Sequence, residues 1–304
     1  MMTNKMAPLW SATPTPFLED GSLDQASVER LVERHINHSV TGLMVGGTCG
    51  EGPMMPLRQL SQLVSMIKKT AGDRLEIAVQ VTDTSAAKVI ENMRHIADAG
   101  ADYHIIAAPW IVADFCNHDF IQRYFLEPLE QSTLPIGLYV RQAPPKMALD
   151  LACWLSFIEH PKVSLIKDSS GSLEYRQALA DKKKELAHVT LLVGDEQAVI
   201  PSVAAGYDGG LMGTGILVAR IIREGLNALQ ANDRPTADLW QERSNRLLLD
   251  IFRKDIGCWM SGLKYSLVQL GIFSTPYTHL TFPFNDEDRN RIDEALKREM
   301  AFLN

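Results

Sequence analysis

Eight short apolar or β-branched runs recur along the chain, most of them starting roughly thirty residues after the previous one, which is the length of a strand plus a helix. They are apolar throughout rather than alternating, as is typical of parallel strands buried on both faces. The predicted strands cover residues 9–13, 42–46, 76–81, 103–108, 135–140, 163–167, 189–193 and 210–212. Amphipathic segments, including residues 23–38, 57–71, 85–99 and 148–159, lie between them. Eight such units favour an α/β fold of the (β/α)₈ TIM-barrel type over a doubly wound sheet.

The strand pattern stops after Ile216, and the rest of the chain is predicted to be helical. Helices are expected over residues 235–254, 258–270 and 285–302, with a proline-containing loop over residues 271–283. A barrel of 304 residues is routinely one domain. We therefore expect a catalytic barrel over residues 8–232 and an all-helical C-terminal extension of the same domain over residues 233–304.

Composition and charge argue against several classes of partner. The formal net charge of the chain is −7, and its 37 acidic and 30 basic residues are interspersed along the sequence. Neither a nucleic acid nor a membrane surface is therefore an expected partner. Residues 1–10 lack the apolar core of a signal peptide, and no run of 18 apolar residues occurs. The four cysteines are scattered, with no metal-ligand spacing, so we expect a reduced cytoplasmic enzyme without a metal.

Polar residues collect where the predicted strands end, which is the catalytic face of a barrel of this kind. They could surround a small anionic substrate. Catalytic roles are predicted for Lys167 and Tyr139. Substrate-binding roles are predicted for Gly47, Thr48 and Cys49 after the second strand, Gly194 and Glu196 after the seventh, and Leu211 in the eighth.

Lys167 follows the apolar run Val163–Ile166 directly and precedes an Asp-Ser-Ser-Gly loop. Burial at the rim of a parallel sheet favours a neutral amine, the form that attacks carbonyl carbons. The alternative is a barrel lysine that is ion-paired, as most buried lysines are. Tyr139, at the end of the fifth strand, is a candidate general acid and base, and packing is the alternative for an isolated tyrosine.

The glycine-rich loop over residues 46–52 resembles an anion cradle, since successive backbone N–H groups and the Thr48 hydroxyl could bind a carboxylate. A tight turn that needs glycines for geometry alone is the alternative. The loop matches neither the Walker nor the dinucleotide pattern. Within it, Glu51 is expected to be a helix-start residue favoured by the helix dipole. Cys49 is expected to be a small packing residue rather than a nucleophile.

Taken together, these motifs resemble the dihydrodipicolinate synthase/N-acetylneuraminate lyase family of class I aldolases, from Trp10 to about Leu270. The resemblance rests on five segments in the family's order and spacing, residues 13–21, 47–51, Tyr139, 166–171 and 206–210. It implies that Lys167 condenses with the ketone of pyruvate or another 2-oxo acid, that Tyr139 moves the proton, and that residues 47–49 hold the carboxylate. It also implies a homo-oligomer, a dimer or tetramer, that needs no metal or organic cofactor.

Three departures from the family pattern bear on the substrate. Cys49 stands where Thr or Ser is usual, and a thiol is a weaker hydrogen-bond donor. Trp110 interrupts the Pro-Tyr-Tyr motif of the lysine-biosynthetic synthases, and Pro144 stands where their substrate-binding arginine is expected. Arg141 is the nearest substitute for that arginine. The last two departures, at Trp110 and Pro144, argue against a true dihydrodipicolinate synthase.

The segment Gly194-Asp195-Glu196 looks more like the sugar-acid lyases of the family, while Trp110 could form a flat wall for an aromatic aldehyde. The leading hypothesis is therefore a lyase acting on pyruvate or a 2-oxo acid, for which a 2-keto-3-deoxy sugar acid is a candidate. One alternative is a dehydratase of such acids that uses the same lysine. Another is a family member that binds 2-oxo acids without turnover.

Overall fold

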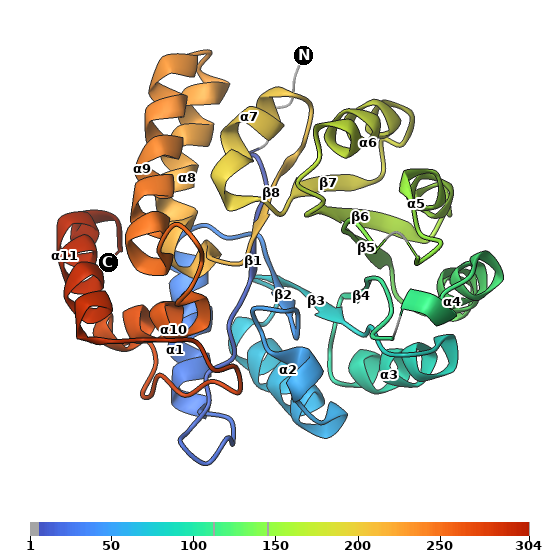
Figure 1. Ribbon diagram of the computed structural model, residues 1–304, viewed down its shortest axis with the longest axis horizontal. Coiled ribbons are helices and arrows are strands. Elements are labelled where there is room, and N and C mark those ends of the chain that lie inside the picture. The colour runs from blue at the N-terminus through green and yellow to red at the C-terminus, as the bar shows by residue number, and fades with distance from the viewer. Residues whose placement is uncertain (1–5, 112, 145, 304) are drawn as a thin grey trace.

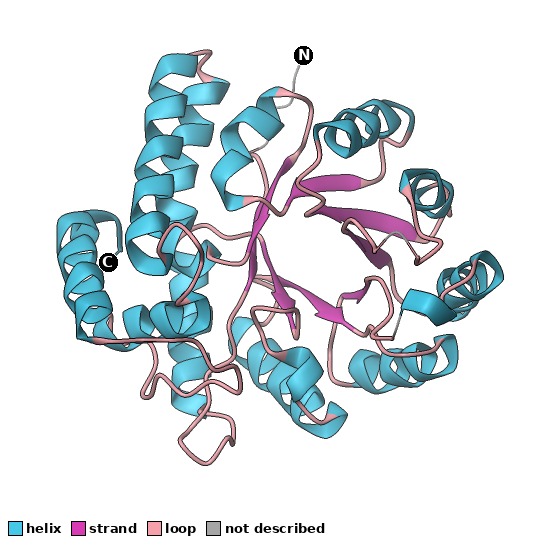
Figure 2. Cartoon of the chain, viewed as in Figure 1, coloured by secondary structure: helices cyan, strands magenta, loops and turns pink. Residues whose placement is uncertain are grey.

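The computed structural model describes residues 6–111, 113–144 and 146–303 of the chain. Residues 1–5 of the N-terminal segment, in which no signal peptide was expected, and Asn304 at the end of the predicted extension lie outside this description. Eight parallel strands form a closed barrel in sequence order, which confirms the predicted TIM barrel (Figures 1 and 2). The strands are β1 (Leu9–Ala12), β2 (Gly42–Val45), β3 (Glu76–Gln80), β4 (Tyr103–Ile106), β5 (Ile136–Val140), β6 (Val163–Asp168), β7 (Thr190–Val193) and β8 (Gly209–Met212).

Helices surround this barrel, one after each strand (Figure 2). Several begin at a residue whose side chain accepts a hydrogen bond from the first turn, such as Asp24 at α1 and Ser172 at α6, which is the usual way to satisfy the free N–H groups there. The helices are α1 (Gln25–Asn37), α2 (Leu57–Ala71), α3 (Ala86–Asp98), α4 (His118–Gln131), α5 (Leu151–Ile158), α6 (Leu173–Glu185), α7 (Val199–Ala204) and α8 (Gly215–Gln230).

Three further helices follow the barrel: α9 (Arg234–Phe252), α10 (Trp259–Gln269) and α11 (Asp286–Leu303). They lie on one side of the molecule, with α9 packed along α8 and α11 packed against α9 and α10 (Figure 1). Residues 271–283 form the predicted loop between α10 and α11. None of the helices in the described part of the chain is long and apolar enough to span a bilayer.

The interior of the barrel is filled by inward-facing side chains of the strands. Trp10 occupies one end of this interior, and Gly42 makes room for it, since a Cβ at Gly42 would lie 2.8 Å from the indole ring. Tyr139 and Leu211 belong to the same interior cluster. The second and larger core lies between the strands and the helices.

Candidate active site

Lys167 and Tyr139 lie side by side at the carboxyl ends of β6 and β5. The strand register pairs these two residues directly, and the Lys167 Nζ lies 4.3 Å from the centroid of the tyrosine ring. Both side chains are buried. Among the described residues no carboxylate lies within ion-pair distance of Lys167, and its Nζ lies 4.0 Å from the Met44 sulfur. The structure therefore does not support the alternative in which Lys167 is an ion-paired lysine of the barrel.

Asp168, the next residue, points to the other side of β6. Its carboxylate accepts hydrogen bonds from the Tyr207 hydroxyl at 2.7 Å and from the Ser170 N–H at 2.9 Å. Burial and the adjacent carboxylate raise the pKa of Tyr207, so that its hydroxyl remains a donor. These contacts hold the end of β6 in place. The sequence assigned no role to either residue, although both stood in segments that matched the family.

The loop after β2 is folded so tightly that its glycines are required. A Cβ at Gly52 would lie 1.8 Å from the carbonyl oxygen of Gly46, and Gly46 itself has a φ of +70°. Thr48 and Cys49 line a cavity at this end of the barrel, but Gly47 does not. The buried Thr48 hydroxyl has no hydrogen-bond partner among the described residues. The loop therefore makes a tight turn that needs its glycines, and it also presents the Thr48 hydroxyl as a hydrogen-bond donor. The two interpretations of this loop are compatible.

Glu51 stands at the start of the short 3₁₀ helix η1 (Gly52–Met54), as expected, but its side chain does not cap that helix. Its φ is +57°, it makes no side-chain cap, and its carboxylate is buried away from the cavity. One carboxylate oxygen lies 2.5 Å from Nζ of Lys264 in α10, and the other accepts hydrogen bonds from the His279 N–H at 2.7 Å and the Thr278 hydroxyl at 3.0 Å. Lys264 also donates to the Tyr277 carbonyl at 2.7 Å.

This ion pair ties the loop after β2 to the C-terminal helices. A buried carboxylate needs a partner because desolvation of an isolated charge is costly. Burial lowers the pKa of Lys264, and the nearby Glu51 carboxylate opposes that effect. Lys264 was missed by the sequence analysis. The available signal was a single lysine between Leu263 and Tyr265 in an otherwise apolar stretch of α10.

Cys49 is a packing residue in the cavity wall. Burial and the charge of Glu196 raise the pKa of its thiol to about 12, so the thiolate form is disfavoured. A Cβ at Gly213 would lie 2.6 Å from the Cys49 sulfur. The glycine after β8 therefore allows the thiol to lie against the backbone.

Gly194 and Glu196 occupy the wall next to the lysine. A Cβ at Gly194 would lie 2.8 Å from Cε of Lys167, so glycine at this position leaves room for the lysine side chain. Glu196 accepts a hydrogen bond from the Thr214 N–H at 3.2 Å, and burial raises the pKa of its carboxyl group. From α9, Gln241 donates to the Glu196 carbonyl at 2.9 Å.

These residues line a cavity of about 590 Å³, a size typical of small-molecule sites. Its walls come from the strand ends and from the segment joining α9 to α10. The lining residues are Ala12, Thr48, Cys49, Tyr139, Arg141, Lys167, Ser169, Gly194, Glu196, Gln197, Gly213, Thr214, Leu248, Leu249, Phe252, Arg253, Lys254, Ile256 and Trp259.

Two residues expected near the substrate lie elsewhere. Leu211 is fully buried in the barrel interior and is not part of the cavity lining. Trp110 lines a separate cavity of about 360 Å³ with Gln80 and Thr82, and its indole N–H donates to the Thr82 carbonyl at 3.0 Å. The flat wall expected from Trp110 is therefore absent from the Lys167 cavity, and Trp259 and Phe252 supply aromatic surface there instead. Within the described ranges, no group of three His, Cys, Asp or Glu side chains is arranged to hold a metal ion.

Comparison with known proteins agrees with this geometry. Residues 5–299 match the model of the dihydrodipicolinate synthetase family. The chain is 24% identical to 4-hydroxy-tetrahydrodipicolinate synthase 1 of Streptomyces coelicolor, over 91% of this chain and 88% of that protein. The structure of dihydrodipicolinate synthase from Bacteroides thetaiotaomicron is similar, with 26% identity, a TM-score of 0.85 and coverage of 98% and 100% of the two chains. YagE of E. coli K12, solved in complex with pyruvate, has 21% identity, a TM-score of 0.84 and coverage of 96% and 98%.

Proposed function

This chain belongs to the dihydrodipicolinate synthetase family, and from that membership we propose that it is a class I lyase that forms a Schiff base with a 2-oxo acid. One observation carries the proposal. A buried lysine amine lies 4.3 Å from the centroid of a buried tyrosine ring, in the wall of a cavity that also presents the Thr48 hydroxyl. Among the described residues the lysine has no carboxylate within ion-pair distance, and the threonine hydroxyl has no hydrogen-bond partner. This arrangement supplies three groups in one place: a nucleophile, a proton carrier and a hydrogen-bond donor for the substrate carboxylate.

In the proposed reaction, Nζ of Lys167 adds to the ketone carbon of the 2-oxo acid, and loss of water gives a protonated imine. The imine accepts the electron pair of the C3–C4 bond when that bond breaks, so an enamine and an aldehyde form. Tyr139 takes the proton of the C4 hydroxyl and returns it to C3 of the enamine. Hydrolysis of the imine then releases pyruvate and the free lysine.

The carboxylate of the 2-oxo acid is proposed to bind the Thr48 hydroxyl and the backbone N–H groups of residues 47–49. We propose a substrate longer than pyruvate, with a 2-keto-3-deoxy sugar acid as the candidate, and an activity distinct from dihydrodipicolinate synthase. Pro144 and Trp110 support this distinction because they replace residues on which that activity depends. The proposed chemistry needs no metal or organic cofactor, because the imine itself accepts the electrons.

A dehydratase acting on the same class of acid is the second candidate, and Glu196 favours it. Its carboxyl group has a raised pKa and lines the cavity, so it could protonate a departing hydroxyl group. The products distinguish the two reactions. Incubation with 2-keto-3-deoxy sugar acids gives pyruvate and an aldehyde from a lyase, whereas a dehydratase gives a longer oxo acid and no pyruvate.

Borohydride reduction in the presence of pyruvate should trap a pyruvyl adduct on Lys167, located by peptide mass spectrometry. The expected mass appears on the peptide that contains Lys167 and on no other. Absence of an adduct with pyruvate and with longer 2-oxo acids would contradict the lyase and the dehydratase alike. The protein would then be a 2-oxo-acid-binding member of the family without turnover.

We further propose that the protein is a homo-oligomer, a dimer or tetramer. Large apolar side chains are exposed in the segments after β2 and β4, namely Met54, Trp110 and Phe115, and such exposure favours association. Light scattering should give a mass at least twice the 33.8 kDa of one chain. A mass of one chain at micromolar concentration would refute the proposal.

We propose that the protein is located in the cytoplasm, which is a reducing compartment. All four cysteines lie among the described residues, where none of them forms a disulfide, and three of them are buried. Such thiols are typical of proteins kept in a reducing environment.

A further inference from the structure

The loop after β2 is closed by its own backbone and by a contact from the segment after β1. The Glu51 N–H donates to the Thr48 carbonyl at 3.2 Å, so Glu51 ends the turn that contains Thr48 and Cys49. The Thr15 hydroxyl donates to the Gly50 carbonyl at 2.6 Å. Thr48 and Cys49 line the cavity. A shift of the backbone at Glu51 is therefore passed directly to the residues that face the substrate.

The backbone of Glu51 is in a conformation that needs support. Its φ of +57° lies in the left-handed region, which residues other than glycine seldom adopt. Such a conformation persists where the surrounding structure enforces it, commonly at functional sites. At Glu51 the support comes through the side chain, because α10 binds one carboxylate oxygen and the loop after α10 binds the other. The ion pair with Lys264 therefore acts on the backbone that presents Thr48.

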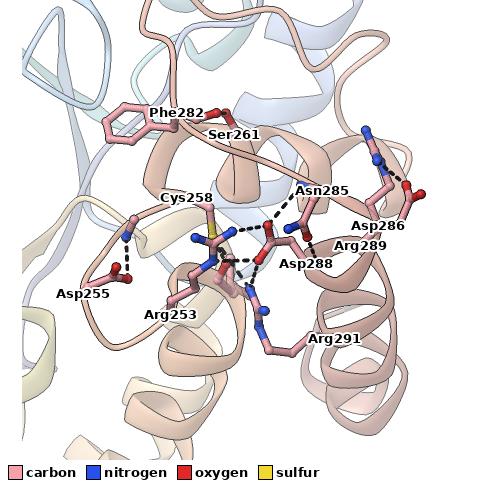
Figure 3. Close-up of polar contacts among 12 residues, drawn as sticks. Arg253, Asp255, Cys258, Ser261, Phe282, Asn285, Asp286, Asp288, Arg289 and Arg291 are labelled. Carbon is pink, nitrogen blue, oxygen red and sulfur yellow. Dashed lines mark hydrogen bonds and ion pairs between the residues drawn. The ribbon is translucent and has the colours of Figure 1, made fainter.

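Lys264 is itself held in a fixed place. Its side chain is fully buried, and its Nζ lies 4.6 Å from the centroid of the Phe17 ring and donates to the Tyr277 carbonyl at 2.7 Å. Earlier in α10, the Ser261 hydroxyl donates to the Phe282 carbonyl at 3.2 Å, which joins the helix to the loop that leads to α11 (Figure 3). Lys264 is therefore a fixed point against which the loop after β2 is placed.

A second ion-pair cluster holds the helices around Lys264 together. Asp288 in α11 is almost fully buried, and it accepts a hydrogen bond from Nε of Arg253, at the end of α9, at 2.8 Å (Figure 3). Arg291 donates to the same carboxylate at 2.7 Å, and the Asn285 N–H donates to it at 3.1 Å. The hydrogen bonds from Arg253 and Arg291 hold the pKa of the Asp288 carboxyl group well below its usual range. Because α10 packs on both α9 and α11, the extension forms one support for Lys264.

A buried ion pair adds little stability by itself, because the cost of desolvating both charges largely offsets their attraction. An apolar pair of similar size often stabilises a protein as well or better. An ion pair does restrict geometry, since the charged groups must meet at hydrogen-bond distance. The Glu51–Lys264 pair therefore has more to offer the position of the loop than the stability of the fold.

We propose that Glu51 and Lys264 are positioning residues for substrate binding, whose ion pair holds the loop after β2 in the geometry in which Thr48 and the neighbouring N–H groups meet the carboxylate of a 2-oxo acid. The identity of that ligand rests on the proposed function. Neither Glu51 nor Lys264 lines the cavity, so both act through Thr48 rather than on the substrate. The C-terminal extension thereby sets the affinity of the barrel for its substrate.

The test measures pyruvate binding by calorimetry on the full chain, on Glu51→Gln and on the double variant Glu51→Gln/Lys264→Met. Glu51→Gln keeps the size of the side chain and removes its charge. We expect it to raise the Kd of pyruvate about tenfold or more, as when a hydrogen bond to a charged group is weakened. It should also lower the unfolding temperature, because the Lys264 ammonium group is left buried without a counter-charge. The double variant removes both charges, so it should recover the unfolding temperature but not the affinity.

Glu299→Gln is the matched control. Glu299 is a buried carboxylate of α11 that accepts a hydrogen bond from Nε of Arg243 at 2.7 Å, and neither residue lines the cavity. This variant also removes the acid of a buried ion pair in the extension, so it should lower the unfolding temperature as Glu51→Gln does. The Kd of pyruvate should not change, because Glu299 does not contact the loop after β2.

A folded Glu51→Gln variant that binds pyruvate with the Kd of the unmodified protein would overturn the proposal. A double variant that recovers affinity together with its unfolding temperature would overturn it as well, since the pair would then only stabilise the fold. If Glu51→Gln does not fold, the double variant decides alone. Glu299→Gln binding as weakly as Glu51→Gln would also count against a role specific to the loop.

Borohydride trapping on the same samples separates this inference from the proposed function. Acetone has a ketone but no carboxylate, so Glu51→Gln should form the acetone adduct on Lys167 at the unmodified rate. Its pyruvate adduct should require higher pyruvate concentrations. If the unmodified protein forms no adduct but Glu51→Gln still loses pyruvate affinity, the positioning role stands and the Schiff-base chemistry falls. An adduct with the same dependence on pyruvate concentration in every variant gives the reverse result.

Discussion

Lys167→Ala should abolish turnover, lowering kcat by at least about 10⁴-fold, as loss of a covalent nucleophile does in other enzymes. Among the described residues, Lys167 is the amine that lies against the Tyr139 ring, so the variant should be unable to form an imine beside the proposed proton carrier. The variant should also lose the borohydride-dependent adduct with pyruvate. Steady-state assays and intact-mass spectrometry measure the two effects on the same preparation.

The fold should survive this substitution. Lys167 makes no ion pair with a carboxylate among the described residues, so its removal leaves no buried charge without a partner. Because burial of a polar amine with little hydrogen bonding is itself costly, thermal unfolding of the variant should occur at the same temperature or higher. A variant that is folded and still turns over 2-oxo acids would show that the nucleophile lies elsewhere.

Tyr139→Phe should lower kcat by about 10² to 10⁴-fold, the usual contribution of a positioned acid or base. The ring remains in the barrel interior, where it packs with Leu165 and Leu192, so only the hydroxyl is lost. Imine formation and bond cleavage both need a proton to move, so the rate of adduct trapping should fall together with kcat. Borohydride quenching at successive times measures the rate of adduct formation, and product assays measure kcat.

Tyr103→Phe is the matched control. Tyr103 packs against the same interior cluster from the opposite end of the barrel, where its hydroxyl donates to Glu76 at 2.8 Å. Its loss should leave kcat within about twofold, since the hydroxyl is remote from the cavity. If Tyr139→Phe runs at the unmodified rate, the proton passes through another group, and Glu196 becomes the leading candidate.

The barrel could be predicted from the sequence because each strand and each helix carries its own local pattern. The proximity of Tyr139 and Lys167 followed from the same pattern, since both residues end neighbouring strands and the parallel register brings them together. Leu211 shows the limit of such reasoning. It also lies in a strand near the catalytic end, but whether a side chain reaches the cavity or fills the interior depends on its layer in the closed barrel.

Contacts between distant segments were the part that the sequence did not reveal. The partner of Glu51 is a lysine in α10, and the loop that borders the cavity is held by Asp288 in α11. Neither contact follows from the periodicity of either segment, because a helix buries an apolar stripe without specifying which strand loop it will meet. Trp110 was assigned to the wrong cavity for the same reason.

The Glu51–Lys264 ion pair also bears on the order in which the molecule is completed. During synthesis all eight strands leave the ribosome before Lys264 does, so a nascent barrel has a Glu51 carboxylate with no counter-charge. Such a carboxylate is expected to stay hydrated rather than buried. The buried arrangement of the loop that carries Thr48, where the substrate carboxylate is proposed to bind, should therefore be completed only when α10 docks and brings Lys264 to Glu51.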